Sequence, residues 1–271
     1  MHKEEIIELW KSVGWNNTND YHNDLIIDAK MPNKIIGDTL HPSKVNPKEF
    51  WKAADEVFLT DPVANHNNNP SDILDIEKAN YQNHLIPLFL GLYGGMEFAI
   101  MNIKRKFNTV NIAEIGCGYG SFEEHFINQR NDIDMYFGFD IIKRTKETIE
   151  LEGEDGTFSS SQVALYEGGS PFNIFYSCNV FQHLSEEQIS KYLKQVYEML
   201  PFGGYFVFTY VRRPKAGYTF HYGQKIEIVD IFRFTMILLD TGYEICYTSE
   251  QIPNSSDSLV PIGFVLKKIN L

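Results

Sequence analysis

Three glycines at alternate positions mark the part of the chain best suited to hold a ligand. Gly116, Gly118 and Gly120 follow an apolar run over residues 110–115, and an apolar helical spacing over residues 122–127 comes directly behind them. Glycine takes positive φ and places no Cβ between the backbone and a ligand. The first turn of a helix offers unpaired N–H groups to a polar or anionic group. The pattern predicts a nucleotide-binding turn in an open α/β sheet.

Ionisable side chains stand beside this turn and beside two other expected strand ends. Glu114 lies in the apolar run itself, Asp140 ends the next expected strand, and His183 follows a later one. Carboxylates accept hydrogen bonds from ligand hydroxyls, and an imidazole with a pKa near ~6.5 accepts a proton at neutral pH. These residues are therefore candidates for ligand binding and for proton transfer.

The elements expected to position these residues begin at residue 109, where strands and helices alternate. Ser185 and Gln188 form a capping box at the start of one helix. The run over residues 205–211 is almost wholly apolar, which fits a strand buried on both faces of a parallel sheet. We expect further strands at 135–139, 157–165 and 173–178, helices at 143–151, 185–200 and 226–239, and a closing antiparallel pair at 243–247 and 262–266.

Residues 1–108 are not needed to build the glycine turn. Helical spacing of apolar residues predicts short helices near 6–13, 50–57 and 73–85. The most apolar segment, 85–103, contains Pro87 and several glycines, so we interpret it as a buried helix or helix pair rather than the roughly 20-residue span a membrane requires. We predict an N-terminal helical cap or lid over 1–108, packed on a core formed by 109–271.

Composition limits the classes of partner. With 271 residues the chain is long enough for one sizeable core. A formal net charge of −12 argues against a nucleic acid as partner, because such proteins carry a basic surface. The three cysteines form no disulfide or metal pattern, which suits a reducing compartment and makes the cytoplasm the expected location. We expect no metal and no membrane partner.

Several motifs, in the same order along the chain, resemble one enzyme family. The segment EIGCGYG at 114–120 resembles the first motif of class I S-adenosylmethionine-dependent methyltransferases, and Asp140 matches the family's acidic residue that holds the ribose hydroxyls. Residues 173–211 resemble the family's fourth strand, following helix, glycine turn and fifth strand. The resemblance covers about 109–271. It implies a Rossmann-like α/β fold with a seven-stranded, mostly parallel sheet, helices on both faces, and S-adenosylmethionine at the carboxyl ends of the first strands.

The resemblance also implies roles for individual residues. The glycine turn would line the methionine and ribose of the cofactor, Asp140 would take the ribose diol, and the residues after the fourth strand would lie near the transferable methyl. The implied cofactor-binding residues are Tyr81, Glu114, Gly116, Cys117, Gly118, Gly120, Asp140, Ile141, Gln162, Cys178 and Asn179, where Tyr81 is a lid residue and Ile141 and Gln162 face the adenine.

The sequence departs from the family pattern at two positions. The acidic residue that often begins the fourth strand is Asn173 here, and the acidic residue after the third strand has no clear counterpart. Gln162 is the substitute expected at the second position, because an amide oxygen accepts a hydrogen bond from an exocyclic amine.

His183 is the expected general base if the methyl acceptor is a hydroxyl group, whose proton must leave during transfer. The alternative for this histidine is a structural role in the loop or at the start of the next helix. We expect a small-molecule acceptor, such as a sugar, polyketide or phenolic hydroxyl. Two other functions stay open: a non-catalytic cofactor-binding domain, and a nicotinamide-dependent oxidoreductase, whose fingerprint would need glycine where Ser121 stands.

Overall fold

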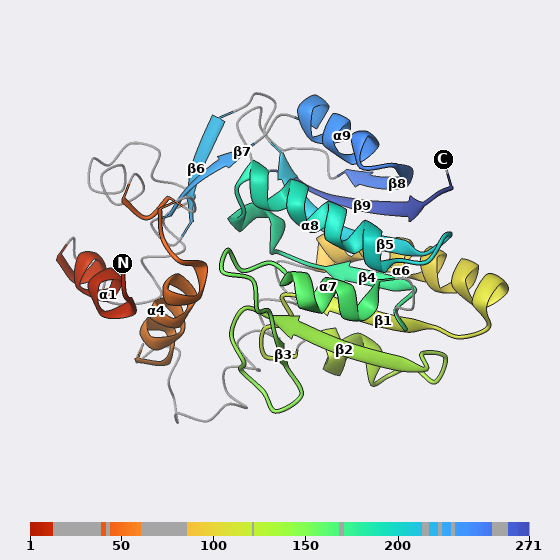
Figure 1. Ribbon diagram of the computed structural model, residues 1–271, viewed down its shortest axis with the longest axis horizontal. Coiled ribbons are helices and arrows are strands. Elements are labelled where there is room, and N and C mark those ends of the chain that lie inside the picture. The colour runs from red at the N-terminus through yellow and green to blue at the C-terminus, as the bar shows by residue number, and fades with distance from the viewer. Residues whose placement is uncertain are drawn as a thin grey trace.

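A computed structural model describes residues 1–12, 39–41, 44–60, 86–120, 122–167, 171–212, 217–221, 224–228, 231–250 and 260–270. Its centre is a seven-stranded sheet with the order β3-β2-β1-β4-β5-β9-β8, shown in Figure 1. The first five strands of that order are parallel to one another, and β9 runs antiparallel to both of its neighbours, β5 and β8, so the expected α/β fold is confirmed. The strands are β1 (Asn111–Ile115), β2 (Met135–Asp140), β3 (Ile149–Glu150), β4 (Ile174–Ser177), β5 (Tyr205–Arg212), β8 (Tyr243–Glu250) and β9 (Val260–Lys268).

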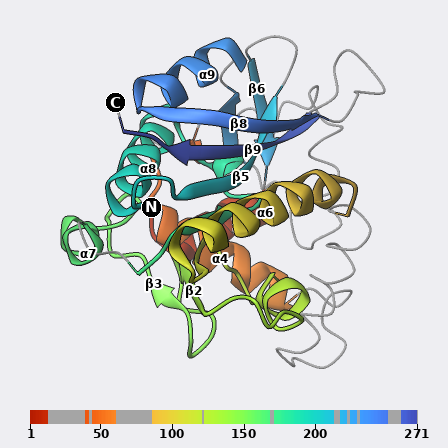
Figure 2. The same cartoon turned by 90° about the vertical axis from the view of Figure 1, so that its right-hand side faces the viewer.

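Alternating side chains of the central strands fill the two faces of the sheet. In β5, Phe206 and Phe208 point to one face and Val207 to the other, and all three are buried. Successive residues of a strand point to opposite faces, so a strand that is apolar at every position needs helices on both sides. Figure 2 shows those two helical layers. One contains α7 (Ser160–Tyr166), α8 (Glu186–Met199) and α9 (Ile231–Asp240), and the other contains α6 (Ile86–Phe107) and the π-helix η2 (Glu123–Ile127).

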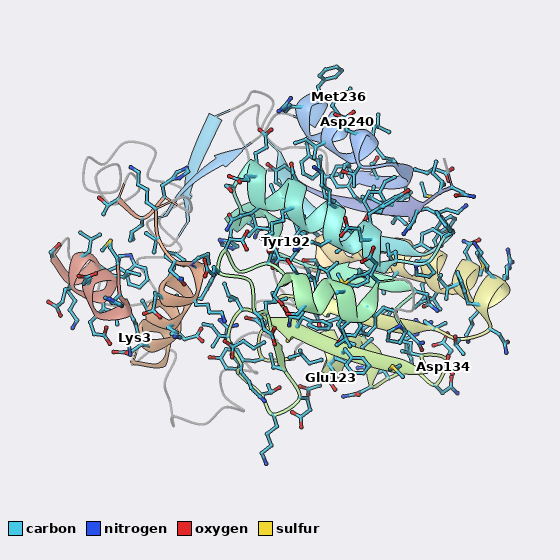
Figure 3. The ribbon with its side chains drawn as sticks, in the orientation of Figure 1. Lys3, Glu123, Asp134, Tyr192, Met236 and Asp240 are labelled. Atoms are coloured by element: carbon cyan, nitrogen blue, oxygen red, sulfur yellow. The ribbon has the colours of Figure 1, made fainter. Side chains whose placement is uncertain are left out.

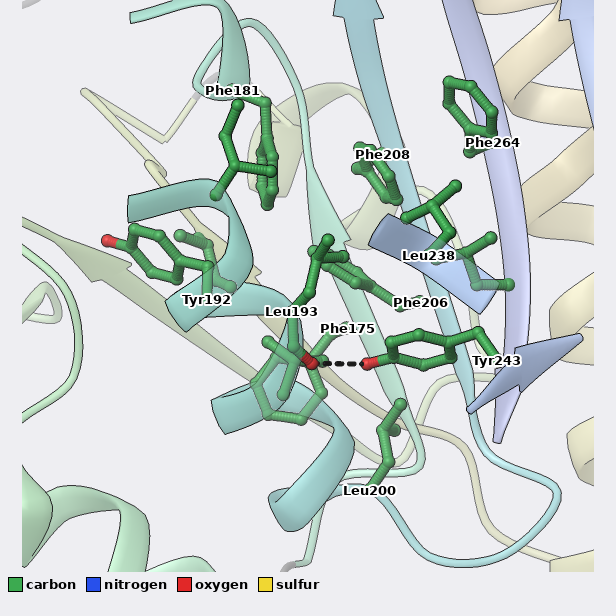
Figure 4. Close-up of a cluster of buried hydrophobic side chains, with 14 of the residues drawn as sticks. Phe175, Phe181, Tyr192, Leu193, Leu200, Phe206, Phe208, Leu238, Tyr243 and Phe264 are labelled. Atoms are coloured by element: carbon green, nitrogen blue, oxygen red, sulfur yellow. Dashed lines mark hydrogen bonds between the residues drawn. The ribbon is translucent and has the colours of Figure 1, made fainter. Parts of the chain in front are cut away.

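The layer formed by α8 and α9 packs on a core of aromatic rings. Phe181, Phe206 and Phe208 lie against one another with ring centroids 4.7–5.7 Å apart. Tyr243 of β8 closes this core, and its hydroxyl donates a 3.1 Å hydrogen bond to the Leu193 carbonyl of α8, as drawn in Figure 4. A buried tyrosine hydroxyl needs such a partner, so the core is both apolar and satisfied at this point.

The long apolar segment before residue 109 forms the helix α6, so a helix is confirmed there, but in its described part only one face is buried, whereas Phe98 and Met101 are exposed. It packs on the sheet beside β5 and β9. A Cβ on Gly95 would lie 2.6 Å from Cγ2 of Val265, so the glycine allows the helix to approach β9 closely. Within the described residues, no helix combines the length and the apolar character that a membrane crossing requires.

The other described N-terminal helices form a small unit of their own. α1 (Lys3–Ser12) and α4 (Pro47–Thr60) pack on each other around Ile6, Trp10 and Phe50. Both helices were expected from apolar spacing. We call them the α1–α4 pair. Figure 1 places this pair beside the carboxyl ends of the parallel strands, where the hairpin of β6 (Gly217–His221) and β7 (Gln224–Ile228) also lies.

The sequence-based predictions for two elements between β2 and β4 are wrong. Residues 143–151 do not form a helix but bends that lead into β3, because the Thr145 and Thr148 hydroxyls bond to each other at 2.8 Å and to nearby backbone N–H groups. Such local bonds compete with helix formation. Residues 157–165 do not form a strand either. Ser159 and Gln162 form a capping box, and the helix α7 begins at the next residue after Ser159.

The helix expected over 226–239 is shorter than predicted. It begins at Ile231, and residues 224–228 belong to β7, which pairs with β6 in a hairpin absent from the sequence-based prediction. The closing antiparallel pair is confirmed as β8 and β9, with Ile245 opposite Leu266.

Candidate functional site

The glycine turn after β1 is fastened to the neighbouring strand. All three of its glycines have positive φ, at +75° for Gly116, +54° for Gly118 and +89° for Gly120. The N–H of Gly116 donates to the Phe139 carbonyl of β2 at 2.7 Å. A Cβ on Gly116 would lie only 2.1 Å from Cγ2 of Val180, in the loop after β4. The backbone of the turn therefore fits between the ends of β2 and β4, and only glycine suits this position.

Asp140 ends β2 and faces the turn. The residue is buried, with 4% of its surface exposed, and its carboxylate accepts three kinds of hydrogen bond. Oδ2 accepts from the Gly118 N–H at 2.9 Å. Oδ1 accepts from the Ile142 N–H at 3.1 Å and from Nη1 of Arg144 at 2.6 Å. The turn and the acidic residue that the sequence singled out are thus in direct contact.

Arg144 links this carboxylate to the α1–α4 pair. Its Nε and Nη2 donate to the two carboxylate oxygens of Asp55 in α4, at 2.9 and 3.0 Å. Its guanidinium also lies over the Tyr119 ring of the glycine turn, 5.5 Å from the centroid. Sequence analysis missed Arg144 and Asp55, because 89 residues separate them and neither belongs to a recognisable motif.

Glu114 is buried in β1 and accepts a short hydrogen bond from the hydroxyl of Tyr136 in β2. Burial and the neighbouring Glu114 charge raise the pKa of Tyr136 well above its usual range, so the tyrosine stays a hydrogen-bond donor. The contact fixes the carboxylate behind the glycine turn. Tyr136 is a second residue that the sequence reading missed, although its place one strand over, opposite Ile112, follows from the parallel register.

The two cysteines of the expected site are free thiols, of which Cys117 is buried and Cys178 is partly buried. Cys117 packs on Gly138, where an added Cβ would lie 2.9 Å from the sulfur, and its Sγ lies 3.9 Å from the Thr148 hydroxyl. Burial, together with nearby carboxylates, raises the pKa of Cys117. Burial also raises the pKa of Cys178 to about 12. Neither thiol is a nucleophile at neutral pH, so both contribute packing and backbone groups.

The residues after β4 come together with α4. Asn179 has a positive φ of +57°, and its N–H donates to the Thr209 hydroxyl of β5 at 2.8 Å. His183 ends the short helix η3 (Phe181–His183), is buried, and meets the Trp51 ring of α4 edge-on at 4.9 Å. The amide oxygen of Gln182 is buried and has no hydrogen-bond partner within the described residues. An amide oxygen of this kind is available to a ligand.

Gln162 has a different function from the one expected. Its amide oxygen accepts hydrogen bonds from the backbone N–H groups of Glu152 and Ser159, at 3.0 and 3.1 Å. Its Nε2 donates to the Glu150 carbonyl at 2.9 Å. Both lone pairs of the amide oxygen are used by the backbone, so we assign Gln162 to the capping of α7. With β3 ending at Glu150, the first acidic side chain after the third strand is Glu152, which is exposed.

Ile141 lies beside Asp140 and packs on the loop before α7. A Cβ on Gly156 would lie 2.5 Å from Cδ1 of Ile141 and 3.4 Å from Cβ of Pro47, which begins α4. The expected adenine-facing residue therefore packs on Gly156, and Pro47 of α4 approaches the same glycine. Tyr81, the expected lid residue, lies outside the described residues.

The glycine turn and the buried carboxylate of Asp140 meet at one edge of the sheet. They lie at the carboxyl ends of β1 and β2, where open α/β sheets bind their ligands. Among the described residues, no group of three His, Cys, Asp or Glu side chains is arranged to hold a metal ion.

Comparison with known proteins identifies a family model. The model described as "Methyltransferase domain" matches residues 95–247, which is more than half of the chain. The match begins in α6 and ends in β8, so it includes the glycine turn and every parallel strand. No curated protein matches the sequence.

Solved structures also show similarity. A Burkholderia thailandensis 1,6-didemethyltoxoflavin-N1-methyltransferase is 12% identical, with 73% of this chain and 88% of that chain covered and a TM-score of 0.45. A Mesorhizobium loti S-adenosylmethionine-dependent methyltransferase is 14% identical, covering 66% and 100%, with a TM-score of 0.43. The Bradyrhizobium japonicum N-methyltransferase NodS, in complex with S-adenosylhomocysteine, is 14% identical, covering 65% and 86%, with a TM-score of 0.41.

Proposed function

The chain belongs to the methyltransferase-domain family, as a class I S-adenosylmethionine-dependent methyltransferase, and from this premise we propose that it methylates a hydroxyl group of a small molecule. The observation that carries the proposed site is the 2.9 Å hydrogen bond from the Gly118 N–H to Asp140, which joins the glycine turn to a buried carboxylate. We propose that this turn receives the methionine and ribose of the cofactor, and that Asp140 accepts hydrogen bonds from the ribose hydroxyls.

Other residues support these contacts. S-adenosylmethionine supplies an electron-poor methyl group on its sulfonium when it is bound. Glu114, fixed by Tyr136, gives the methionine end a carboxylate, and the glycines of the turn let the backbone come close to the ligand. We propose that Ile141 covers one side of the adenine, and that Glu152 takes the position after the third strand for which Gln162 was expected.

The residues after β4 favour a small polar acceptor. His183 is buried beside Trp51, and the preceding residue in the chain, Gln182, has an amide oxygen with no hydrogen-bond partner in the described part of the structure. We propose that His183 removes the proton of the acceptor hydroxyl, that Gln182 orients the acceptor, and that Trp51 shields it from water. A general base of this kind contributes about 10²–10⁴-fold to the rate. The net charge of −12 supports a small molecule over a nucleic acid as acceptor.

Calorimetric titration tests the proposed cofactor site. We expect S-adenosylmethionine and S-adenosylhomocysteine to bind, and Asp140→Asn to weaken S-adenosylhomocysteine by about tenfold to a hundredfold through lost charge-assisted hydrogen bonds. Asp132→Asn is the matched control, because Asp132 also pairs with an arginine, Arg130, but in the loop that precedes β2. Binding of a nicotinamide cofactor, with no heat from the sulfonium compounds, would replace this site assignment.

A screen for transfer of a labelled methyl group tests the acceptor and the base. We expect labelled product from a hydroxyl-bearing metabolite, and His183→Gln to lower turnover by about 10²-fold or more while affinity for S-adenosylhomocysteine is unchanged. The variant should also lose the rise of rate with pH that deprotonation of an imidazole gives. Turnover retained in the variant would remove His183 from the chemistry, and labelling of an amine would replace the hydroxyl acceptor.

A further inference from the structure

Arg144 stands between two carboxylates that come from different parts of the chain. It donates one hydrogen bond to Oδ1 of Asp140 at 2.6 Å and a fork of two hydrogen bonds to Asp55 at 2.9 and 3.0 Å. The arginine side chain is 9% exposed, that of Asp140 is 6% exposed, and that of Asp55 is 23% exposed. A buried guanidinium held in this way is a well-ordered part of the site rather than a solvated surface charge.

The hydrogen bonds that Asp140 already accepts leave too little room for a diol. An ionised carboxylate offers about four lone-pair sites, two on each oxygen. Oδ1 is filled by the N–H of Ile142 and by Arg144, and Oδ2 accepts one bond from Gly118. A ribose diol that binds both oxygens needs one site on each, and Oδ1 has none left.

One of the three donors must therefore leave when a diol binds. The N–H groups of Gly118 and Ile142 belong to the backbone, one in the glycine turn and the other two residues after the end of β2, so they are held in place. Arg144 is the only one of the three that donates from a side chain. We propose that Arg144 is a place-holder for the cofactor's ribose: it occupies Oδ1 of Asp140 and yields that oxygen to a ribose hydroxyl when the cofactor binds, while it keeps its two hydrogen bonds to Asp55. This inference rests on the proposed role of Asp140.

The place-holder connects the cofactor site to α4. Lys48, Trp51 and Asp55 lie at spacings of three and four along α4, so they share one face of the helix. Each contacts a residue at or after the end of a different strand: Lys48 pairs with Glu150 of β3 at 2.7 Å, Trp51 meets the His183 ring after β4, and Asp55 holds Arg144 after β2. A change at Arg144 therefore acts on the helix that covers His183, and ribose binding sets the position of Arg144 and Asp55 together.

Two variants of the Arg144–Asp55 ion pair distinguish a place-holder from an ion pair with a purely structural role. Arg144→Met removes the competitor for Oδ1, so we expect S-adenosylhomocysteine to bind about tenfold more tightly, the size of one charge-assisted hydrogen bond. Asp55→Asn removes the second holder and leaves Arg144 on Asp140, so we expect binding to weaken by about threefold to tenfold. A structural ion pair would weaken binding in both variants, because both would loosen the same junction.

The control is Lys48→Met, which breaks the other ion pair between α4 and the strand ends without touching Asp140. We expect it to leave the affinity unchanged. Calorimetric titration of the four proteins, each shown to be folded by thermal melting, gives the result. Tighter binding of S-adenosylhomocysteine by Arg144→Met together with weaker binding by Asp55→Asn supports the place-holder. Affinities that change in the same direction in both variants, or that do not change in either, overturn it. A wild-type chain that binds no S-adenosylhomocysteine would instead refute the proposed cofactor site.

Hydrogen exchange on the wild-type chain gives the same answer if Arg144→Met does not fold. At matched saturation, S-adenosylhomocysteine should change amide exchange in α4, whereas its 2′,3′-dideoxy analogue, which lacks the diol, should not. Equal exchange in α4 with both ligands would show that the diol does not act through Arg144, and would overturn the inference.

Discussion

The sheet and the α1–α4 pair are held together by different forces. The sheet buries aromatic and aliphatic side chains on both faces, with Phe175 and Phe206 fully buried on one of them. The α1–α4 pair has a small separate cluster, in which Trp10 meets Phe50 edge-on at 5.9 Å. Figure 3 shows the contrast, with Tyr192 at the centre of the molecule and Lys3 out on the pair. Most of the apolar burial, and so most of the stability, belongs to the sheet.

The junction between the two regions is polar and aromatic rather than a continuation of either core. Among the described residues it includes Asp55 with Arg144, Lys48 with Glu150, and the Trp51 ring against His183. Such contacts depend on charge and geometry and bury little apolar area. The sheet therefore provides most of the stability, whereas the contacts that a ligand can rearrange lie at the edge of the sheet. Four experiments test whether the sheet and the α1–α4 pair differ in this way.

The largest effect is expected from a truncation in the core of the sheet. Phe206→Ala removes a fully buried ring of β5 and leaves a cavity, which costs about 3–5 kcal/mol in the free energy of unfolding. Urea denaturation followed by far-ultraviolet circular dichroism measures this loss. A loss below about 1 kcal/mol would show that the ring is not part of a well-packed core.

The same truncation in the α1–α4 pair should act locally. Phe50→Ala also removes a ring that is almost fully buried, with 1% of its surface exposed. Because the pair has its own cluster, we expect faster amide exchange in α1 and α4 and a main unfolding transition that moves less than in Phe206→Ala. Hydrogen exchange with mass spectrometry measures both. Equal losses in the main transition would mean that the two regions unfold as one unit.

Matched helix caps sharpen the comparison at a smaller scale. Ser185 caps α8, which packs on the sheet. Asn46 caps α4, and its Oδ1 accepts a hydrogen bond from the Lys48 N–H at 2.9 Å. Ser185→Ala should lower the global free energy of unfolding by about 1 kcal/mol. Asn46→Ala should instead speed exchange in the first turn of α4 while the global value stays nearly constant. A global loss from Asn46→Ala as large as that from Ser185→Ala would contradict the separation.

The smallest effect is expected in how the free energy of unfolding depends on acid pH, through an ion pair beside the sheet. Hydrogen bonds from Arg130 lower the pKa of Asp132 to about 2, and Arg130 also pairs with Glu97 of α6. The unfolded chain binds the proton first, so the stabilisation is complete above a pH of about 4 and is lost as the pH falls toward 2. The Asp132 side chain is 25% exposed, so solvent partly screens its charge and the effect is small. Asp132→Asn should flatten the acid limb of the stability curve between these values, and an unchanged limb would exclude the contribution.

Local sequence patterns predicted much of this fold and part of the candidate site. The alternate glycines, the apolar run of β5 and the capping box at Ser185 each act over a few residues, and the structure has a turn, a buried strand and a helix there. Asp140 was found for the same reason, since it directly follows a predicted strand. The mistakes at 143–151 and 157–165 are also local: the hydroxyl bonds of Thr145 and the capping box of Ser159 outweighed the weak apolar patterns.

By itself the sequence determined the α/β order of the chain, the glycine turn and the acidic residue beside it, because each depends on neighbours along the chain. Only the tertiary structure decided that Arg144, four residues after Asp140, is also held by Asp55 of α4, because 89 residues separate Arg144 from Asp55. It also decided that Trp51 covers His183. Contacts of this kind depend on how separate elements pack, and no local pattern of residue types records them.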